Sequence, residues 1–286
     1  MKILLLGQSG FIGHNIEEYF NCRKSYILDK FSHEKLDVLN EDSVVDCLQK
    51  GKYDVVLNCL DSYAGNGYME RRLRMFMNLA CHNDLYGKMI YFGTGAEYGR
   101  KFPLANVSEE DIGKTVPGDE YGLAMYIMNR IARESTNIYN LRLFGIFGRY
   151  EQWQTRFISN AVCKKIKNYP ITIRQERRMS YTDVSDLCSI VEWSIKNTPN
   201  FHDYNIVSST SFLLSELARI VNSTDGNEVP VYIARQGIFS EYTGNGDRLL
   251  HETGYKYKDM HISIRDLFTY YRDNIDLIDN YSLLYQ

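Results

Sequence analysis

The chain begins with Lys2-Ile3-Leu4-Leu5-Leu6-Gly7-Gln8-Ser9-Gly10-Phe11-Ile12-Gly13-His14, in which an apolar run leads directly into three glycines spaced G-x-x-G-x-x-G. Residues 3–6 show the continuous apolar pattern of a strand that is buried on both faces of a sheet. The first glycine would permit a tight turn, the second a close approach of the backbone to a phosphate, and the third close packing of a helix on the strand. This stretch therefore predicts a phosphate-binding loop between a strand and a helix.

A dinucleotide would be held at this loop by the residues around the start of the helix. Glycine removes the side chains that would keep the pyrophosphate away, and the free N–H groups of the first helical turn carry a partial positive charge. The expected cofactor-binding residues of the loop are Gly7, Gly10, Phe11, Ile12 and Gly13.

An acidic residue follows at the distance that is typical of a dinucleotide site. Asp29 lies 22 residues after Gly7 and ends the predicted strand at 26–28. A carboxylate at that point would accept hydrogen bonds from the adenosine ribose hydroxyls of NAD. Lys30 comes next and would accommodate the 2′-phosphate of NADP, so the sequence leaves both cofactors open. Asp37 is a further candidate, for the adenine edge.

Strand and helix patterns alternate through the first half of the chain, as in a parallel sheet built from βαβ units. We expect strands at 3–6, 26–28, 55–57, 89–92 and 139–143, and helices at 13–20, 41–49, 68–82 and 120–135. Beyond residue 145 the pattern changes to Gly and Pro breaks and charge clusters, with helices near 156–167, 185–196, 213–221 and 262–272. These patterns predict an α/β fold with a doubly wound parallel sheet over 1–145 and a second domain over 146–286.

Composition excludes several classes of protein. The 286 residues carry 33 basic and 36 acidic side chains, a formal charge of −3, which gives no electrostatic basis for nucleic-acid binding. No apolar run approaches 18 residues, so no membrane span is expected, and the start lacks the length of a signal segment. The six cysteines form no C-x-x-C pair and no metal-ligand spacing with a histidine. We expect no metal, buried reduced thiols and a cytoplasmic protein.

Four further motifs make the resemblance to one family specific. They are Val55-Val56-Leu57-Asn58-Cys59, Phe92-Gly93-Thr94-Gly95-Ala96-Glu97-Tyr98-Gly99, Glu120-Tyr121-Gly122-Leu123-Ala124-Met125 and Leu141-Arg142-Leu143-Phe144-Gly145-Ile146-Phe147-Gly148. With the glycine loop, they make nearly the whole chain resemble the extended short-chain dehydrogenases/reductases that act on nucleotide sugars, the epimerase/dehydratase family.

The resemblance implies a fold and partners. It implies a Rossmann domain that holds NAD or NADP, with Asn58 at the cofactor, and a smaller C-terminal α/β domain that binds a nucleoside-diphosphate sugar. In this family the chain crosses back between the domains, so the boundary near residue 145 is approximate. The family also forms homodimers through two helices that correspond to 68–82 and 120–135. The first of them carries more apolar residues than one core face needs.

The resemblance also implies the chemistry. The family uses a Tyr-x-x-x-Lys pair and a Ser or Thr, which places Tyr121 as the proton donor or acceptor and Thr94 as the hydroxyl that orients the reacting sugar oxygen. Met125 occupies the lysine position, at the cofactor. A thioether carries no charge and donates no hydrogen bond, whereas a tyrosine that titrates near 10 works better beside a cation. A second pair, Tyr126 and Arg130, fits the motif less well in register.

The residue at position 125 leaves three interpretations open. The protein would be an enzyme whose tyrosine is tuned in another way, a poor enzyme, or a catalytically weak protein that binds NAD(P) and a sugar nucleotide. Thr94-Gly95-Ala96 lacks the two acids of the family's dehydratases, so 4,6-dehydration is disfavoured. We predict a 4-ketoreductase of a nucleoside-diphosphate 4-keto-sugar, because reduction needs the protonated tyrosine. The alternative enzyme is a nucleotide-sugar 4-epimerase.

Arginines in the second half are the candidates for the diphosphate of the substrate. A guanidinium fork suits a diphosphate, because two N–H groups can bind two oxygens at once. By the family resemblance, the region that contains Arg156 and a later arginine would hold the nucleotide. The first choice is Arg177, and Arg248 is a weaker one. A solvated basic patch is the competing interpretation of the cluster at 174–178.

Overall fold

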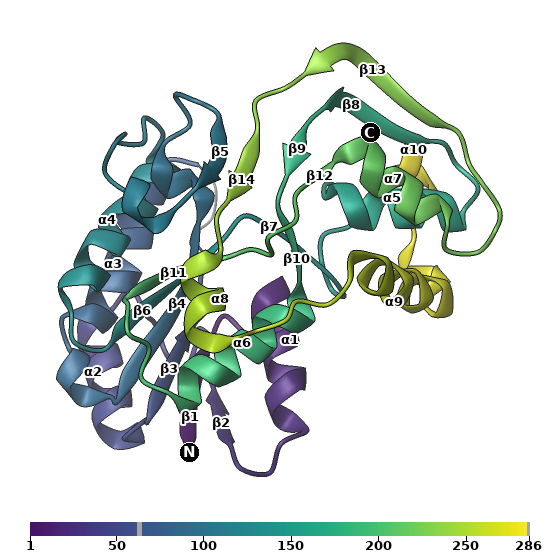
Figure 1. Cartoon of the computed structure of the whole chain (residues 1–286). Helices are drawn as coiled ribbons and strands as arrows, with labels where there is room; N and C mark the ends of the chain where they lie inside the picture. The colour runs from purple at the N-terminus through teal and green to yellow at the C-terminus, as the bar shows by residue number, and fades with distance from the viewer. Residues whose placement is uncertain (62–64, 285–286) are drawn as a thin grey trace. The chain divides into compact units, whose positions relative to one another are not determined.

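A computed structural model describes residues 1–61 and 65–284. The chain folds into two compact units that interleave in sequence (Figure 1). Unit 1 comprises Met1–Phe102, Ser108–Leu143 and Cys188–Ile206. Unit 2 comprises Pro103–Val107, Phe144–Leu187 and the chain from Val207 onward.

Unit 1 is built on a six-stranded sheet in which all strands run parallel. In spatial order its strands are β11 (Asp203–Ile206), β6 (Ile138–Leu143), β4 (Lys88–Thr94), β3 (Val55–Asn58), β1 (Lys2–Leu6) and β2 (Ile27–Lys30). From β1 the chain builds the sheet outward in both directions. The carboxyl ends of β1 and β3 therefore mark the point where the strand order reverses, which is where doubly wound sheets bind their ligands.

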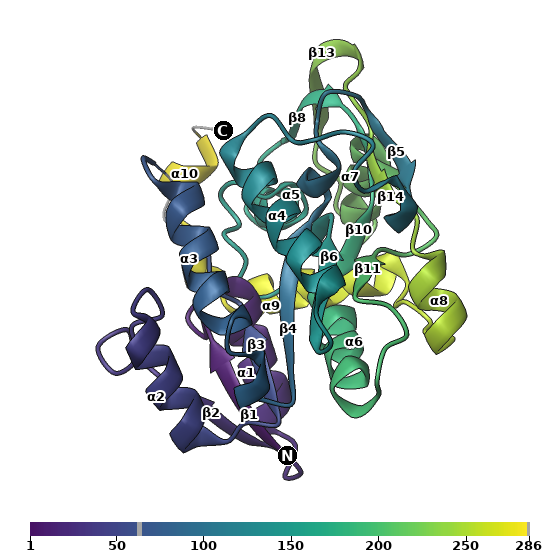
Figure 2. The same ribbon diagram turned by 90° about the vertical axis from the view of Figure 1, so that its left-hand side faces the viewer.

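Helices cover both faces of this sheet. α2 (Glu41–Gly51), α3 (Tyr68–Ala80) and α4 (Glu120–Glu134) lie on one face, and Figure 2 shows them in front of the strands. α1 (Phe11–Asn21) and the later part of α6 (Val184–Lys196) lie on the other face (Figure 1). This arrangement confirms the predicted doubly wound α/β fold.

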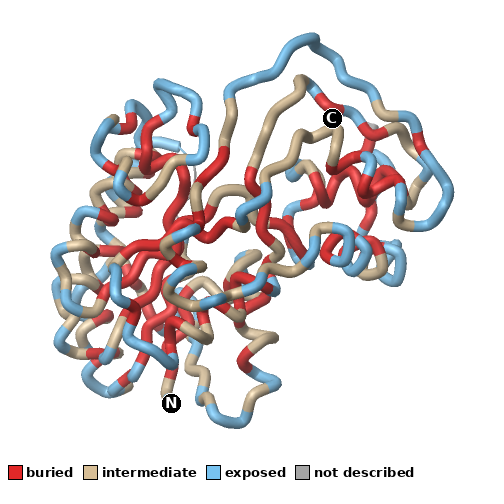
Figure 3. The backbone as a smooth tube through the Cα atoms, viewed as in Figure 1, coloured by how far each residue is buried: buried red, intermediate tan, exposed pale blue. Residues whose placement is uncertain are grey.

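Apolar side chains on both faces explain why these strands are central. The residues of β3 are all buried, as are Ile3, Leu4, Leu5 and Leu6 of β1, and Figure 3 shows the sheet as a buried layer. Side chains that alternate along a strand point to opposite faces, so each strand packs against two layers of helices. The five strands and the first four helices expected from the sequence are present, with ends that differ by at most two residues.

The sixth strand, β11, was not expected from the sequence because its residues Asp203-Tyr204-Asn205-Ile206 alternate polar and apolar side chains. All four are nevertheless buried. The polar side chains at 203 and 205 are satisfied by a buried ion network in unit 1.

This network centres on Arg142 in β6, whose side chain is fully buried. Its Nε donates to Glu97 Oε2 at 2.7 Å, and its Nη2 donates to Asp203 Oδ2 at 2.7 Å. Nη1 donates to Asn205 Oδ1 at 3.0 Å. Glu97 Oε1 in turn accepts the backbone N–H of Thr94 at 2.9 Å. The network therefore joins β4, β6 and β11 at the end of the sheet where Thr94 lies.

Unit 2 has a helical core with short strands around it. α5 (Phe157–Ile166), α7 (Leu214–Asn222) and α9 (Met260–Asp273) pack together, and α8 (Asp247–Thr253) and α10 (Asn280–Leu284) are shorter. The paired strands are β8 (Ile171–Glu176) with β13 (Val231–Ile238), and β7 (Gly145–Phe147) with β10 (Tyr181–Asp183). A four-stranded sheet has the order β12 (Phe212–Leu213), β9 (Arg178–Met179), β14 (Tyr242–Gly244) and β5 (Leu104–Val107).

All six cysteines are unpaired thiols, but two of them, Cys22 and Cys81, are exposed. The expectation that every thiol is buried was therefore wrong: Cys22 and Cys81 are the C-cap residues of α1 and α3, where the chain reaches solvent. Within the two described ranges, no helix has both the length and the apolar character needed to cross a membrane.

The buried network around Arg142 predicts a large and specific loss of stability. Arg142→Met would leave the carboxylates of Glu97 and Asp203 without their shared cation, and removing one partner of a buried pair costs about 3–5 kcal/mol. Arg133 also pairs with Asp203, at 2.8 Å, but is one quarter exposed, so Arg133→Met should cost much less. Urea unfolding of the two variants tests this order, and equal losses would contradict it.

Candidate active site

The glycine loop has the geometry that a pyrophosphate requires. Gly7 has a φ of +79°, and a Cβ there would lie 2.7 Å from the carbonyl group of Cys59, which follows β3. A Cβ at Gly13 would lie 2.1 Å from the carbonyl oxygen of Gly7, so this glycine allows α1 to pack on the loop. A Cβ at Gly10 would meet only ordinary contact, with Gly7 O at 3.5 Å. The fold of the loop therefore requires glycine at positions 7 and 13. At position 10 glycine is not needed for the fold, but the missing side chain leaves room for a ligand at the start of α1.

The start of α1 is free to bind an anion. Gly10 is the N-cap residue and has no side chain to accept the N–H groups of the first turn. Phe11 and Ile12 are the first two helical residues and are only partly buried. Gln8 Nε2 donates to Phe31 O at 3.1 Å and ties the loop to the segment after β2. These features fit the phosphates of a dinucleotide.

Asp29 already has two partners in the structure. Its Oδ2 lies 3.1 Å from Lys2 Nζ and accepts a hydrogen bond from Tyr53 Oη at 3.1 Å. Asp29 pairs in register with Leu4, three residues before Gly7, so it lies about 10 Å from the glycine loop along the strand direction. A contact between Asp29 and a ribose would have to compete with these partners, and it stays a prediction.

The two other candidates after β2 are also engaged locally. Lys30 pairs with Glu17 of α1, which places its ammonium group beside the helix that begins at the glycine loop. Asp37 Oδ1 accepts the N–H of Leu39 at 3.0 Å and lies 3.7 Å from His33 Nε2. Neither contact decides between NAD and NADP.

At the ends of β3 and β4 the predicted residues are buried. Asn58 ends β3, and its Oδ1 accepts the N–H of Leu60 at 3.1 Å, so it shapes the turn beside the glycine loop. Thr94 ends β4, is 8% exposed, and accepts the N–H of Ala96 at 3.3 Å. Two neighbouring strands thus bring these side chains to the same edge of the sheet.

Tyr121 lies in the first turn of α4 and forms a hydrogen bond with the Thr94 side chain. Asp119 caps this helix, accepting the N–H of Gly122 at 2.8 Å. Burial raises the pKa of the Tyr121 phenol above its ordinary value, and the charge of Asp61 raises it further. The hydrogen bond from Thr94 and the charge of Arg72 lower it. The net effect is a pKa above the ordinary value, so Tyr121 is protonated near neutral pH.

Met125 lies one turn further along α4 and is 1% exposed. Its side chain belongs to the apolar cluster between the sheet and helices α2–α4. It therefore contributes packing, and no charge, on the side of Tyr121 where the family has lysine.

Two of the three arginines that are candidates for binding the substrate lower the pKa of one tyrosine in unit 2. Burial raises the pKa of Tyr181, and the charges of Arg177 and Arg156 lower it. The Arg177 guanidinium also lies 5.3 Å from the ring centroids of both Phe239 and Tyr242. Arg248 lies in α8 and is partly buried. A role in binding a diphosphate remains a prediction for all three.

Sequence reasoning missed several charged residues. The charges of Arg72 and Asp61 shift the pKa of Tyr121, but neither residue belongs to one of the sequence motifs. In unit 2, burial raises the pKa of Glu151 to about 8, and Ser159 donates a hydrogen bond to its carboxylate. In the sequence, Arg72 has the same helical spacing as Tyr68 and Phe76, which face the core, and this spacing is the feature that indicates its burial.

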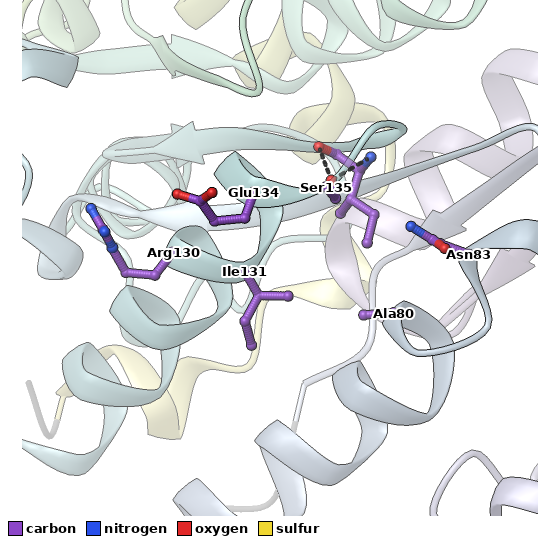
Figure 4. Close-up of a pocket in the computed structure, with 7 residues that line it drawn as sticks. Ala80, Asn83, Arg130, Ile131, Glu134 and Ser135 are labelled. Atoms are coloured by element: carbon purple, nitrogen blue, oxygen red, sulfur yellow. Dashed lines mark hydrogen bonds between the residues drawn. The ribbon is translucent and has the colours of Figure 1, made fainter.

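A groove of about 500 Å³ in unit 1 lies away from this site (Figure 4). It is lined by Ala80 of α3, by Arg130, Ile131 and Glu134 near the end of α4, and by neighbouring residues. Tyr121 is at the opposite end of α4, about 15 Å away along the helix axis. The groove is therefore not part of the candidate active site.

A sequence model of the NAD dependent epimerase/dehydratase family matches residues 3–207. The chain belongs to this family. The ADP-L-glycero-D-manno-heptose-6-epimerase of Cupriavidus pinatubonensis is 25% identical over 194 residues, which span 59% of this chain and 58% of that protein. The match thus covers less than two thirds of its relative.

Solved structures of this family share the fold. A GDP-L-fucose synthetase from Naegleria fowleri, bound to NADP, aligns with a TM-score of 0.81 at 13% identity, over 96% of this chain and 95% of its own. The GDP-mannoheptose C4 reductase MlghC from Campylobacter jejuni, with NADP bound, aligns with a TM-score of 0.72 at 18% identity, over 95% and 98%. At these identities the likeness establishes the Rossmann-type fold of the family.

The open space at Gly10 allows a test of cofactor binding that leaves the fold intact. Gly10 has a φ of −81°, which valine can adopt, so Gly10→Val should fold normally. The added side chain would occupy the approach of the pyrophosphate and should lower the affinity for NAD and NADP at least a hundredfold, measured by calorimetric titration.

Gly13→Ala is the contrasting variant, because its Cβ would clash with Gly7 O and should lower the thermal midpoint. Unchanged affinity in a folded Gly10→Val protein would remove the dinucleotide site from this loop.

Proposed function

We propose that this protein is an NAD(P)-dependent oxidoreductase of nucleotide sugars, and most specifically a 4-ketoreductase. The observation that carries the proposal is the environment of Tyr121. Its phenol is hydrogen-bonded to Thr94, and burial raises its pKa. A tyrosine held in the protonated form beside a second hydroxyl can donate a proton to a ketone oxygen.

The residues of the loop fit the cofactor. Gly7 and Gly13 form the turn, Gly10 leaves the space for the pyrophosphate, and the N–H groups of Phe11 and Ile12 would meet its oxygens. When bound, the nicotinamide would supply hydride to the carbonyl carbon of the sugar.

The protein side chains would complete the reduction. Thr94 would hold the carbonyl oxygen by a hydrogen bond, and Tyr121 would transfer its phenolic proton to that oxygen as the carbon receives hydride. The product is the alcohol, and Tyr121 is left as a phenolate that must recover a proton from water. The Thr94 backbone is fixed by Glu97, so the hydroxyl starts in place.

The raised pKa of the Tyr121 phenol also favours reduction over oxidation. A raised pKa leaves little phenolate near neutral pH, and alcohol oxidation needs phenolate as the base. A 4-epimerase must both oxidise and reduce, so it is the second candidate. The curated relative, a heptose 6-epimerase, supports epimerisation as that alternative. The third candidate is a weakly catalytic binding protein, which Met125 alone would favour.

The substrate class is supported by the family and by the arginines of unit 2. The curated relative and the solved reductases are named for nucleotide-linked sugars. We propose that Arg177 and Arg156, with Arg248 as a further candidate, bind the diphosphate. The charges of Arg177 and Arg156 both lower the pKa of Tyr181, so both lie near this side chain in unit 2.

Tyr121→Phe tests the proposed proton transfer. Removing the hydroxyl should lower the rate of NAD(P)H consumption with 4-keto nucleotide sugars at least a hundredfold, because general acid catalysis contributes about 10²- to 10⁴-fold. Tyr126→Phe, one position beyond Met125, is the matched control and should retain activity. Equal rates for wild type and Tyr121→Phe would contradict the mechanism. Binding of cofactor and sugar nucleotide without turnover in the wild type would favour the binding protein.

Met125→Lys tests the effect of the missing charge. A cation four residues from Tyr121 should favour the phenolate and extend alcohol oxidation to lower pH, by about one pH unit for each 1.4 kcal/mol of added interaction. Reduction should change little, since it uses the protonated phenol. An unchanged pH profile of oxidation in a folded variant would show that position 125 does not influence Tyr121.

We also propose a homodimer through α3 and α4. Partly exposed apolar side chains recur at helical spacing on both helices, at Leu73 and Met77 of α3 and at Leu123, Ile127 and Ile131 of α4. Ile131 also lines the groove of Figure 4. A second copy would cover this apolar surface.

Light scattering tests the homodimer. Wild type at micromolar concentration should show twice the chain mass of 33.4 kDa, and Ile127→Glu should show the single mass because a charge would be buried at the interface. Lys52→Glu, at the C-cap of α2, is a control that also introduces a negative side chain. A monomeric wild type would refute the homodimer.

A further inference from the structure

Arg72 is a buried arginine on the face of α3 that meets Tyr121. It lies one turn after Tyr68, and residues four apart share one face of a helix. The Tyr68 ring lies against the Tyr121 ring, with a distance of 5.9 Å between centroids. The Arg72 side chain is only 9% exposed. Helix α3 therefore directs a cation to the region of α4 where the candidate proton donor lies.

The contacts of Arg72 fix its guanidinium at the end of β3. Its Nη1 donates to the carbonyl oxygen of Leu60 and lies 3.4 Å from Asp61 Oδ1. Asp61 Oδ1 also accepts a hydrogen bond from Tyr68 Oη at 2.9 Å. The Arg72 Nε is buried and has no hydrogen-bond partner among residues 1–61 and 65–284. One N–H of a buried cation is thus left unsatisfied.

This position is costly for an arginine. Burying a guanidinium loses hydration, and the carboxylate that faces it, on Asp61, is itself 69% exposed and only weakly desolvated. An apolar side chain would pack in the α3–α4 layer at lower cost. The charge therefore needs a reason other than packing, and the neighbouring Tyr121 provides one.

Charged groups reach Tyr121 from several elements. Asp61, which follows β3, and Glu97, which follows β4, are acidic and disfavour the phenolate, and Arg72 of α3 opposes them. Glu97 is shared with Arg142 in the buried network. Tyr68 and Thr94 are the polar neighbours. On the helix of Tyr121 itself, position 125 contributes an apolar methionine.

We propose that Arg72 is a positioning residue that supplies, from α3, the positive charge beside Tyr121 that position 125 lacks. This inference rests on the proposed function of Tyr121 as a proton donor. When Tyr121 gives up its proton, the phenolate is buried near two acids, and Arg72 is the counter-charge that limits the cost. In oxidation, the same charge helps Tyr121 to act as the base.

The direct test measures the acidity of Tyr121 without cofactor or substrate. Tyrosines are replaced globally by 3,5-difluorotyrosine, whose phenol is more acidic, and the Tyr121 signal is assigned in ¹⁹F spectra by its loss in Tyr121→Phe. Arg72→Gln should raise the pKa of this signal by about one unit, a tenfold change in ionisation. Arg72→Lys should keep most of the wild-type value. Arg74→Gln is the matched control, because Arg74 of the same helix is exposed and pairs with Glu70.

A rescue experiment separates charge from packing. Adding Met125→Lys to Arg72→Gln should return the pKa of Tyr121 toward the wild-type value, although the contacts of Arg72 with Leu60 and Asp61 stay lost. In the enzyme, Arg72→Gln should reduce alcohol oxidation about tenfold at fixed pH below the pKa. It should slow ketone reduction less, since reduction starts from the phenol that is already protonated. The double variant should recover oxidation.

An unchanged pKa of Tyr121 in folded Arg72→Gln overturns the proposal. Arg72→Met, which preserves the packing of the stem, is the second variant if glutamine prevents folding, and the same outcome applies to it. A failure of Met125→Lys to restore the pKa would also overturn it, because the role would then be structural. If wild type shows no turnover, the proposed function fails, and the ¹⁹F titration still decides whether Arg72 acts on Tyr121.

Discussion

The candidate active site in unit 1 depends on the ion pairs of one buried side chain, the guanidinium of Arg142. It holds Glu97 and Asp203 at 2.7 Å each, far from solvent, and thereby joins three strands of the sheet. Because Glu97 also binds the backbone of Thr94, the hydroxyl that meets Tyr121 is positioned by buried charges and not by a mobile loop. Buried polar groups stabilise a fold when they satisfy one another, and Arg142, Glu97 and Asp203 do so here.

The chemistry of the site follows from the balance of charge around Tyr121. Burial and Asp61 favour the neutral phenol, whereas Thr94 and Arg72 favour its ionised form. In the proposed reaction, Tyr121 would give its proton only when a stronger acceptor, the developing alkoxide, is in contact with it. The family usually has a lysine four residues after the tyrosine. Here that position is Met125, whose side chain packs in the apolar layer between the sheet and helices α2–α4. We propose that Arg72 of α3 supplies the positive charge instead.

Local patterns predicted most of the fold and the turn geometry of the glycine loop. Gly7 and Gly13 were identified because turn and packing constraints act within seven residues, and the apolar strands because burial on both faces leaves a continuous pattern. Strand β11 was missed because its polar residues are satisfied by partners about 60 and 100 residues away. For the same reason the partners of Asp29 and the approach of Arg72 to Tyr121 could not be foreseen: each depends on contacts that only the folded chain creates.

Isotope transfer tests the proposed reaction, in which hydride reaches C4 of a keto sugar while Tyr121 supplies the proton. Wild type would be supplied with NADPD or NADD deuterated at the transferred position, together with 4-keto nucleotide sugars, and the products examined by mass spectrometry and NMR. A 4-ketoreductase would place one deuterium at C4 of the product for each cofactor oxidised. No oxidation of the cofactor with any 4-keto sugar, together with interconversion of 4-hydroxy nucleotide sugars in which C4 keeps the substrate's own hydrogen, would contradict a ketoreductase and indicate an epimerase that recycles its own hydride.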